Sequence, residues 1–203
     1  MMTAAEEKII AATITCMEEY GLEGVTIRRI GEKAGMNSAA VNYYFRSKEA
    51  LLERVKEVTL DNAFGWEDFA YTESLPLEKQ LTDIFSFFAL NALTYPRVIQ
   101  SHFYDILARN DYNTQVTARF NAFLGKLSGE VKRKRPDMDD ETVSLLLMQL
   151  AAASVLYFSA FPKLFEPFSG FDTAAAGFRE KYVADLVKRM LTPQREDAPN
   201  TAL

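Results

Sequence analysis

LEGVTIRRIGEKAGMNSAAVNYYFRSKEALL, residues 22–52, is the most informative segment of the chain. Thr26 precedes a short helix-forming run, and Gly35 follows that run as a residue that ends helices. Asn37 precedes a second run, so the pattern predicts two short helices joined by a turn that contains glycine. This arrangement is a helix-turn-helix. Ser47 is placed to cap the helix that follows.

The charge of the chain is distributed unevenly around this segment. Between Gly24 and Lys48 there are five basic residues and one acidic residue, whereas the whole chain has a net charge of -5. A local positive stripe on an acidic body is typical of a specific DNA reader. Ser38 and Ala39 are small enough to let the second helix approach base edges, and Asn42 can hydrogen-bond bases or phosphates.

The counts of thiol and imidazole side chains exclude several protein classes. The chain has one cysteine, Cys16, and one histidine, His102, which excludes an internal disulfide and a metal site built from several such residues. No Ser-His-Asp set, glycine-rich phosphate loop or carboxylate pair stands out. We therefore expect no enzyme, no metal and no cofactor. The N-terminus lacks a signal-peptide pattern, which predicts a cytoplasmic protein.

Helical periodicity dominates the rest of the chain. Apolar residues recur at helical spacing over 77–92, 98–107 and 116–131, and no run alternates as a strand would. With 203 residues, of which 48% are hydrophobic, the chain is long enough to bury a full core. We predict an all-α fold of about nine helices, with an N-terminal helix-turn-helix domain at 1–47, a larger helical domain at 48–191 and a flexible tail at 192–203.

One apolar segment has two interpretations. Residues 142–162 carry no formal charge, and at 21 residues they are roughly long enough to span a bilayer as a helix. Five Ser, Thr and Gln residues interrupt the segment, and much of its apolar content is alanine. We favour a helix packed on its own core and on a partner subunit over a membrane span.

The span from about Glu6 to Leu52 resembles the DNA-binding domain of the TetR family of bacterial transcriptional regulators. The resemblance is carried by residues 26–30, 34–37, 41–45 and 47–52 in their combined spacing. Two positions depart from the family pattern, which often has alanine at position 31 and histidine at position 44. The resemblance covers about a quarter of the chain.

The resemblance implies a set of DNA contacts. The side chains nearest the bases would be Ser38, Ala39 and Asn42, whereas others would touch phosphates or face the backbone at the groove edge. Ile30, Val41 and Phe45 would form the core of the small domain. The full set of implied DNA-binding residues is Thr26, Arg28, Arg29, Asn37, Ser38, Ala39, Asn42, Tyr43, Tyr44 and Lys48.

The resemblance also implies that the larger domain dimerises and holds a small-molecule effector. The best interface candidates are the helices expected at Thr142–Phe161 and at about Asp172–Leu191, because both are apolar on more than one face. An effector pocket would be mostly apolar with a few polar groups. Although aromatic stripes at helical spacing are more often plain core, we name as ligand-binding candidates Trp66, Phe88, Asn91, His102, Phe103, Gln149 and Tyr157.

The leading hypothesis is a sequence-specific DNA-binding regulator that acts as a homodimer on a pseudo-palindromic operator. We expect a repressor that is released from double-stranded DNA by a small, largely apolar or aromatic effector, since linked binding is reciprocal. The alternative is an all-helical small-molecule-binding or membrane-associated protein without a DNA function.

Overall fold

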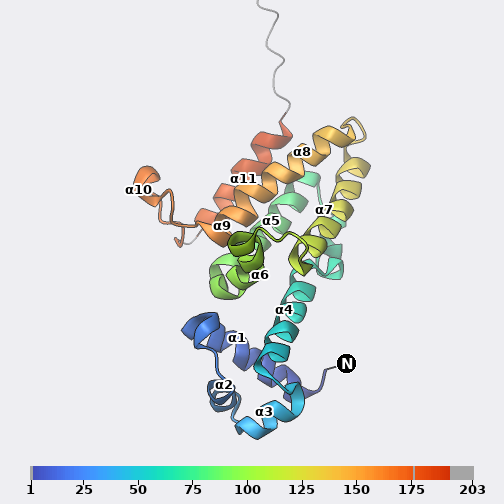
Figure 1. Cartoon of the computed structure of the whole chain (residues 1–203). Helices are drawn as coiled ribbons and strands as arrows, with labels where there is room; N and C mark the ends of the chain where they lie inside the picture. The colour runs from blue at the N-terminus through green and yellow to red at the C-terminus, as the bar shows by residue number, and fades with distance from the viewer. Residues whose placement is uncertain (1, 176, 193–203) are drawn as a thin grey trace, which may run out of the picture.

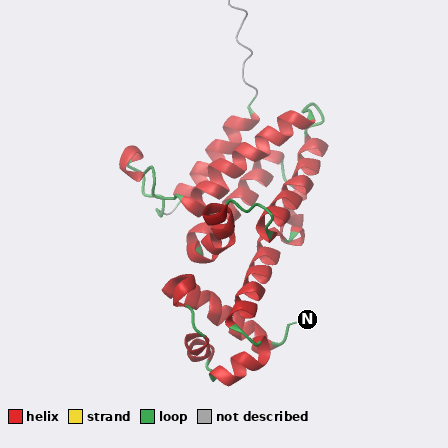
Figure 2. Ribbon diagram, in the orientation of Figure 1, coloured by secondary structure: helices red, strands yellow, loops and turns green. Residues whose placement is uncertain are grey.

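The chain folds into helices and loops throughout residues 2–175 and 177–192, which are the residues that the computed structural model describes (Figure 1). Figure 2 shows no strand in this part of the chain, so the all-α prediction is confirmed. The elements are α1 (Ala4–Gly24), α2 (Ile27–Ala34), α3 (Ser38–Phe45), α4 (Lys48–Phe64), η1 (Trp66–Ser74), α5 (Leu77–Thr94), α6 (Pro96–Arg109), α7 (Gln115–Lys134), α8 (Asp140–Leu150), η2 (Ala151–Leu156), α9 (Tyr157–Ala160), α10 (Glu166–Ser169) and α11 (Phe178–Leu191).

The three caps predicted around the helix-turn-helix are all present. A backbone N–H of the first turn donates to the side chain of Thr26 at 3.3 Å, of Asn37 at 2.8 Å and of Ser47 at 3.1 Å. Gly35 ends α2 with φ of 63°, in the left-handed region where glycine has no Cβ penalty. Local side-chain chemistry therefore fixes where α2, α3 and α4 begin.

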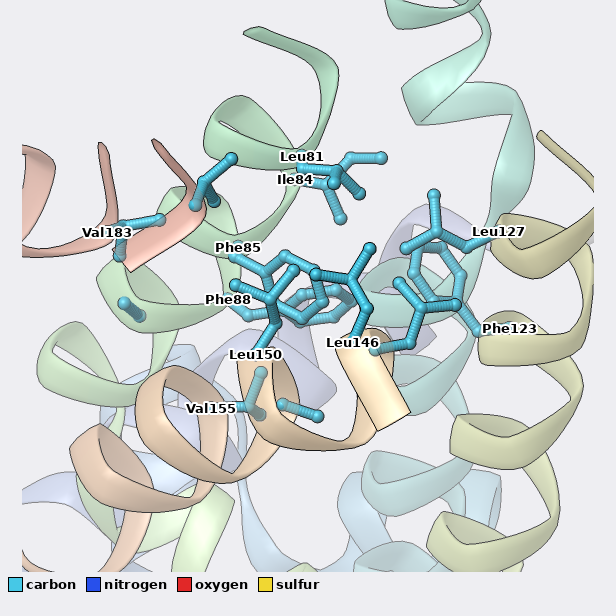
Figure 3. Close-up of a cluster of buried hydrophobic side chains, with 14 of the residues drawn as sticks. Leu81, Ile84, Phe85, Phe88, Phe123, Leu127, Leu146, Leu150, Val155 and Val183 are labelled. Carbon is cyan, nitrogen blue, oxygen red and sulfur yellow. The ribbon is translucent and has the colours of Figure 1, made fainter. Parts of the chain in front are cut away.

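Two hydrophobic clusters organise the molecule. The N-terminal cluster is formed by α1, α2, α3 and the first half of α4, and it also contains Val98 at the start of α6. The C-terminal cluster centres on α5, where Phe85 and Phe88 pack against Leu146 and Leu150 of α8 and Val183 of α11 (Figure 3). The helix α4 runs from one cluster to the other, since its residues Leu51 and Val55 lie in the first cluster and Phe64 packs on the second (Figure 1).

The helices α8, η2 and α9 form one continuous rod, Asp140–Ala160, which matches the uncharged helix expected at Thr142–Phe161. Of the helices in the described part of the chain, this is the one with the length and hydropathy to cross a membrane, but half of its most apolar window is buried inside the fold. Its central turn is a π-helix, and the hydroxyl of Tyr182 donates to the carbonyl of Ala153 within it at 2.9 Å.

The C-terminal helix is shorter than predicted. It was expected from about Asp172 but α11 begins at Phe178, because the preceding residues form turns and Gly177 adopts φ of 81°. The structure also adds two elements that periodicity did not indicate, the 3₁₀-helix η1 and the four-residue α10. The tail predicted at 192–203 lies outside the described residues beyond Thr192.

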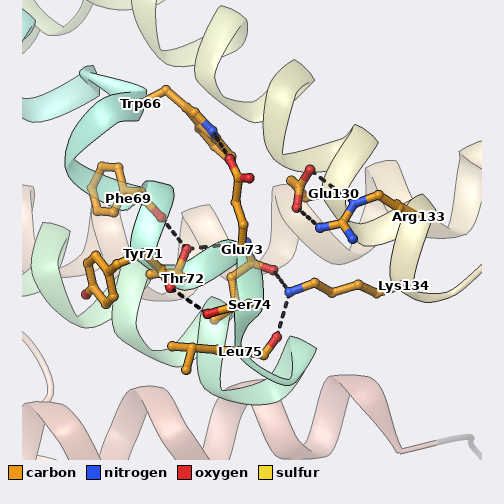
Figure 4. Close-up of polar contacts among 11 residues, drawn as sticks. Trp66, Phe69, Tyr71, Thr72, Glu73, Ser74, Leu75, Glu130, Arg133 and Lys134 are labelled. Atoms are coloured by element: carbon orange, nitrogen blue, oxygen red, sulfur yellow. Dashed lines mark hydrogen bonds and ion pairs between the residues drawn. The ribbon is translucent and has the colours of Figure 1, made fainter.

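Polar contacts connect η1 to the start of α5 and the end of α7 (Figure 4). The Lys134 ammonium donates to the Leu75 carbonyl and to the Gln80 side chain, both at 2.6 Å. Burial lowers the pKa of Lys134. The indole N–H of Trp66 donates to Glu73 at 2.7 Å, so this tryptophan is held within η1.

Candidate nucleic-acid interface

The second helix of the helix-turn-helix, α3, is divided into a buried and an exposed face. Val41 and Phe45 are buried in the N-terminal cluster, which fixes the rotation of the helix. The side chain of Tyr43 is 82% exposed, and its ring meets the ring of Tyr44 edge to face at 5.3 Å. The exposed face carries the predicted base-reading and phosphate-binding residues Ser38, Ala39, Asn42, Tyr43 and Tyr44.

The two arginines of α2 have different surroundings. Arg28 forms an ion pair with Glu32 of the same helix at 2.9 Å. Because both side chains are exposed, Arg28 can leave this pair and turn toward a phosphate. Arg29 donates to the Gly24 carbonyl at 2.5 Å, and its guanidinium lies 4.4 Å from the centre of the Tyr20 ring. These contacts hold Arg29 against α1, so Arg28 is the more available of the two cations.

Thr26 and Asn37 each cap a helix in addition to making the predicted DNA contact. Their side-chain oxygens accept the capping hydrogen bonds of α2 and α3. The Asn37 amide nitrogen and the Thr26 hydroxyl hydrogen are still available as donors. Both side chains lie at helix N-termini, where the helix dipole favours an anion such as a DNA phosphate.

The junction between α3 and α4 adds a basic residue that the sequence interpretation did not include among the DNA contacts. Arg46 is exposed and adopts φ of 62°, which is uncommon for a residue with a Cβ. It is followed by Ser47 and Lys48, so two cations flank the N-terminal cap of α4. The local basic count contained Arg46, but nothing in the sequence indicated its backbone conformation.

The predicted ligand-binding residues do not line a single cavity. Phe88 is buried in the C-terminal cluster and Trp66 packs on it, whereas Phe103 is half-buried on α6. Gln149 lines a groove between α8 and α11, and Tyr157 stacks on Phe165 at 5.8 Å. These five residues therefore lie in different parts of the molecule and do not face one common cavity.

The remaining two candidates, Asn91 and His102, line separate pockets. The Nε2 atom of His102 lies 3.0 Å from the hydroxyl oxygen of Thr59. Burial lowers the pKa of His102 to about 4, and the nearby Lys56 ammonium adds to this effect. His102 is therefore neutral at pH 7, as expected of a packed histidine.

Sequence comparison identifies the helix-turn-helix region. Residues 9–55 match the family model described as bacterial regulatory proteins, tetR family. This N-terminal segment is therefore similar to that family. A curated relative, the HTH-type transcriptional repressor KstR2 of Mycolicibacterium smegmatis, is 34% identical over 80 residues. That alignment covers 39% of this chain and 38% of KstR2, so the chain spans less than half of the length of this relative.

Structural comparison extends the likeness to the whole TetR fold. A TetR-family regulator from Mesorhizobium loti has a TM-score of 0.68 at 16% identity, covering 94% of this chain and 98% of its own. The regulator FadR from Bacillus subtilis, solved in complex with stearoyl-CoA, has a TM-score of 0.62 at 14% identity and covers 92% and 97%. At these identities the similarity establishes the fold alone.

Proposed function

We propose that the protein is a sequence-specific DNA-binding transcriptional regulator of the TetR type, and not an enzyme. The observation that carries the proposal is the exposed face of α3 in a domain of that family. Small residues at the start of α3 allow close approach to the major groove, and Asn42 can read a base edge. Tyr43, Arg28 and Lys48 fix the register by contacts to phosphates.

A homodimer is part of this proposal, because two half-sites one helical turn apart, about 34 Å, require two copies of α3 related by a two-fold axis. The groove between α8 and α11 supports this assembly. Leu145, Met148 and Ala152 form an exposed apolar stripe along the rod at a spacing of three and four residues. Leu186 and Met190 of α11 line the other side of the groove. Packing this face on its copy would remove it from water.

The exposed half of the Asp140–Ala160 rod is thus assigned to a subunit interface, which is why we favour a cytoplasmic regulator over the membrane-associated alternative. Sedimentation of the purified protein without detergent tests this choice. We expect a compact dimer. Aggregation that only detergent reverses would favour the membrane alternative.

We further propose that the regulator is a repressor that releases its operator when it binds a small, largely apolar effector. The relative KstR2 is described as a transcriptional repressor, and the neighbour FadR was solved with stearoyl-CoA. The absence of any enzyme-like constellation in the sequence is in keeping with a binding function. Effector and operator affinities would be linked through two conformations of the dimer.

A gel-shift assay against DNA from the intergenic region beside the gene, with non-specific competitor and a salt series, tests the proposed function. Tyr43→Ala removes an exposed ring from α3 and should weaken binding about tenfold, equivalent to about 1.4 kcal/mol. Tyr71→Ala is the matched control, because Tyr71 is also an exposed tyrosine and lies on η1 in the other part of the molecule.

Three results would count against the proposal or its details. If neither this DNA nor a library of genomic fragments is bound selectively, the protein is not a sequence-specific regulator. If Tyr43→Ala binds as tightly as Tyr71→Ala, α3 does not read the DNA. If affinity does not fall with rising salt, phosphate contacts do not position the protein.

A further inference from the structure

A pocket of about 390 Å³ lies where the two hydrophobic clusters meet, and we call it the junction pocket. Part of its wall belongs to the DNA-binding domain itself, because α1 contributes Ala11, Ile14 and Thr15. The rest of the wall comes from α4, α5 and the start of α6. The full lining is Ala11, Ile14, Thr15, Thr59, Asn62, Ala63, Phe87, Asn91, Tyr95, Val98 and Ile99.

The lining of the junction pocket is uncharged. It contains no Asp, Glu, Lys or Arg, and most of its surface is aliphatic or aromatic. Its strongest hydrogen-bonding groups are two carboxamides, Asn62 and Asn91. The Asn91 amide nitrogen donates to the Phe87 carbonyl at 3.0 Å, which leaves its side-chain oxygen as an acceptor. Such a pocket suits an apolar, uncharged molecule that carries a hydrogen-bond donor.

Two other hollows are less suited to this ligand chemistry. The groove along α8 and α11 is wide and open and is the face that we assign to the dimer. The pocket beside His102 is smaller, about 170 Å³, and is lined by the charged residues Glu53, Lys56, Asp105 and Asp111. Only the junction pocket among these three combines an apolar lining with elements of both clusters.

The start of α6 is attached to the DNA-binding domain by two kinds of contact. The Glu18 carboxylate on α1 accepts the backbone N–H of Val98 at 2.8 Å and of Arg97 at 3.2 Å. The Val98 side chain is buried in the N-terminal cluster. Since Tyr95 provides no side-chain cap, Glu18 serves as the cap of α6 from another domain.

The helix α5 belongs to the C-terminal cluster, whereas the start of α6 is held by α1. A single residue connects these two helices. That residue is Tyr95, which has non-helical dihedral angles of φ -126° and ψ 55° and lines the junction pocket. A molecule in the pocket would lie between α1 and the start of α6 on one side and α4 and α5 on the other. Its size would therefore affect the angle between the DNA-binding domain and the body.

We propose that the junction pocket binds an uncharged, largely apolar small molecule with one hydrogen-bonding group, and that this molecule changes the position of α1 relative to α5. The binding part of this proposal stands on the pocket alone. The regulatory part rests on the proposed function, because it requires that the position of α1 control DNA affinity.

The test uses phenylnaphthylamine, a neutral apolar fluorophore with one N–H, added to the full-length protein. Its sulfonated analogue, anilinonaphthalene sulfonate, has the same rings but a negative charge. Ala11→Phe and Thr15→Phe place a ring into the pocket from exposed positions on α1. Ala118→Phe, at an exposed position on α7 outside the pocket lining, is the matched control.

We expect saturable binding of phenylnaphthylamine that both α1 variants weaken by at least about tenfold, while Ala118→Phe leaves it unchanged. The sulfonate should bind more weakly, because no cation lines the pocket to replace the water lost from the charge. Wild-type affinity in both α1 variants would overturn the assignment of the site. Tighter binding of the sulfonate would overturn the uncharged ligand class.

The regulatory part is tested by gel shift with and without phenylnaphthylamine. A loss of DNA affinity in wild type that is absent in Ala11→Phe supports the coupling. Unchanged DNA affinity at saturating fluorophore overturns the coupling, although the site stands. Because DNA binding without fluorophore and fluorophore binding without DNA are measured separately, failure of the proposed function is distinguishable from failure of the site.

Discussion

Replacement of Glu18 by alanine is expected to destabilise the joint between α1 and α6. The variant removes two hydrogen bonds, to Val98 at 2.8 Å and to Arg97 at 3.2 Å, from a helix N-terminus that has no other side-chain cap. Loss of an N-cap costs about 0.5–2 kcal/mol, and a carboxylate near the positive end of the helix dipole adds about 0.3–1 kcal/mol. We expect Glu18→Ala to lower the free energy of unfolding by about 1–2 kcal/mol. Glu18→Gln, which keeps an acceptor but not the charge, should cost less than about 1 kcal/mol.

Urea unfolding at one fixed protomer concentration measures the effect, since the stability of the proposed dimer would depend on concentration. Glu23→Ala is the control, because Glu23 is an exposed carboxylate near the end of the same helix. Its effect should stay within about 0.5 kcal/mol. A Glu18→Ala variant as stable as Glu23→Ala would refute the idea that Glu18 holds α6.

Three further predictions concern other parts of the structure. His102 has an ordinary pKa of 6.5 that burial lowers to about 4, so unfolding takes up a proton below pH 6.5 and stability falls as the pH drops. From pH 7 to pH 5 this should cost about 2 kcal/mol, a loss that His102→Gln should not show in urea unfolding at the two pH values. Lys134→Met leaves the buried Gln80 oxygen without its donor and should cost about 1–3 kcal/mol by thermal unfolding, whereas Lys132→Met, at an exposed ion pair, should cost almost nothing. Arg46→Gly should be about 1 kcal/mol more stable than Arg46→Ala, because glycine adopts φ of 62° without strain. Equal stabilities of the two variants would show that the backbone at position 46 is not strained.

The parts of the fold that the sequence predicted are those decided by neighbours in the chain. Thr26, Asn37 and Ser47 each accept a hydrogen bond from the backbone N–H three residues ahead, so the residue type and spacing are sufficient evidence. The exposed face of α3 follows from the same logic, because Val41 and Phe45 are apolar positions four residues apart. The DNA contacts assigned to that face remain predictions.

The features that the sequence did not predict depend on distant residues. Glu18 caps a helix that begins about 80 positions later, and Val98 joins a core made mostly of the first 55 residues. No local pattern distinguishes Glu18 from the neighbouring Glu19, which pairs with Lys33. The ligand-binding candidates were chosen by residue type alone, which could not indicate which helices would enclose a pocket.

The π-helix in the Asp140–Ala160 rod has a consequence for how the length of this chain can vary. A π-turn holds one more residue than the α-helical turn it replaces, so deleting one residue from Ala151–Leu156 would leave a regular helix. Deletion of a residue from a regular α-helix rotates the residues after it by about 100°, whereas here the lost residue is the one that the π-turn already accommodates. Phe158 would therefore stay in the C-terminal cluster together with Leu146 and Leu150. A single-codon deletion within Ala151–Leu156 should therefore be tolerated far better than one in the regular α-helix α8 that precedes it.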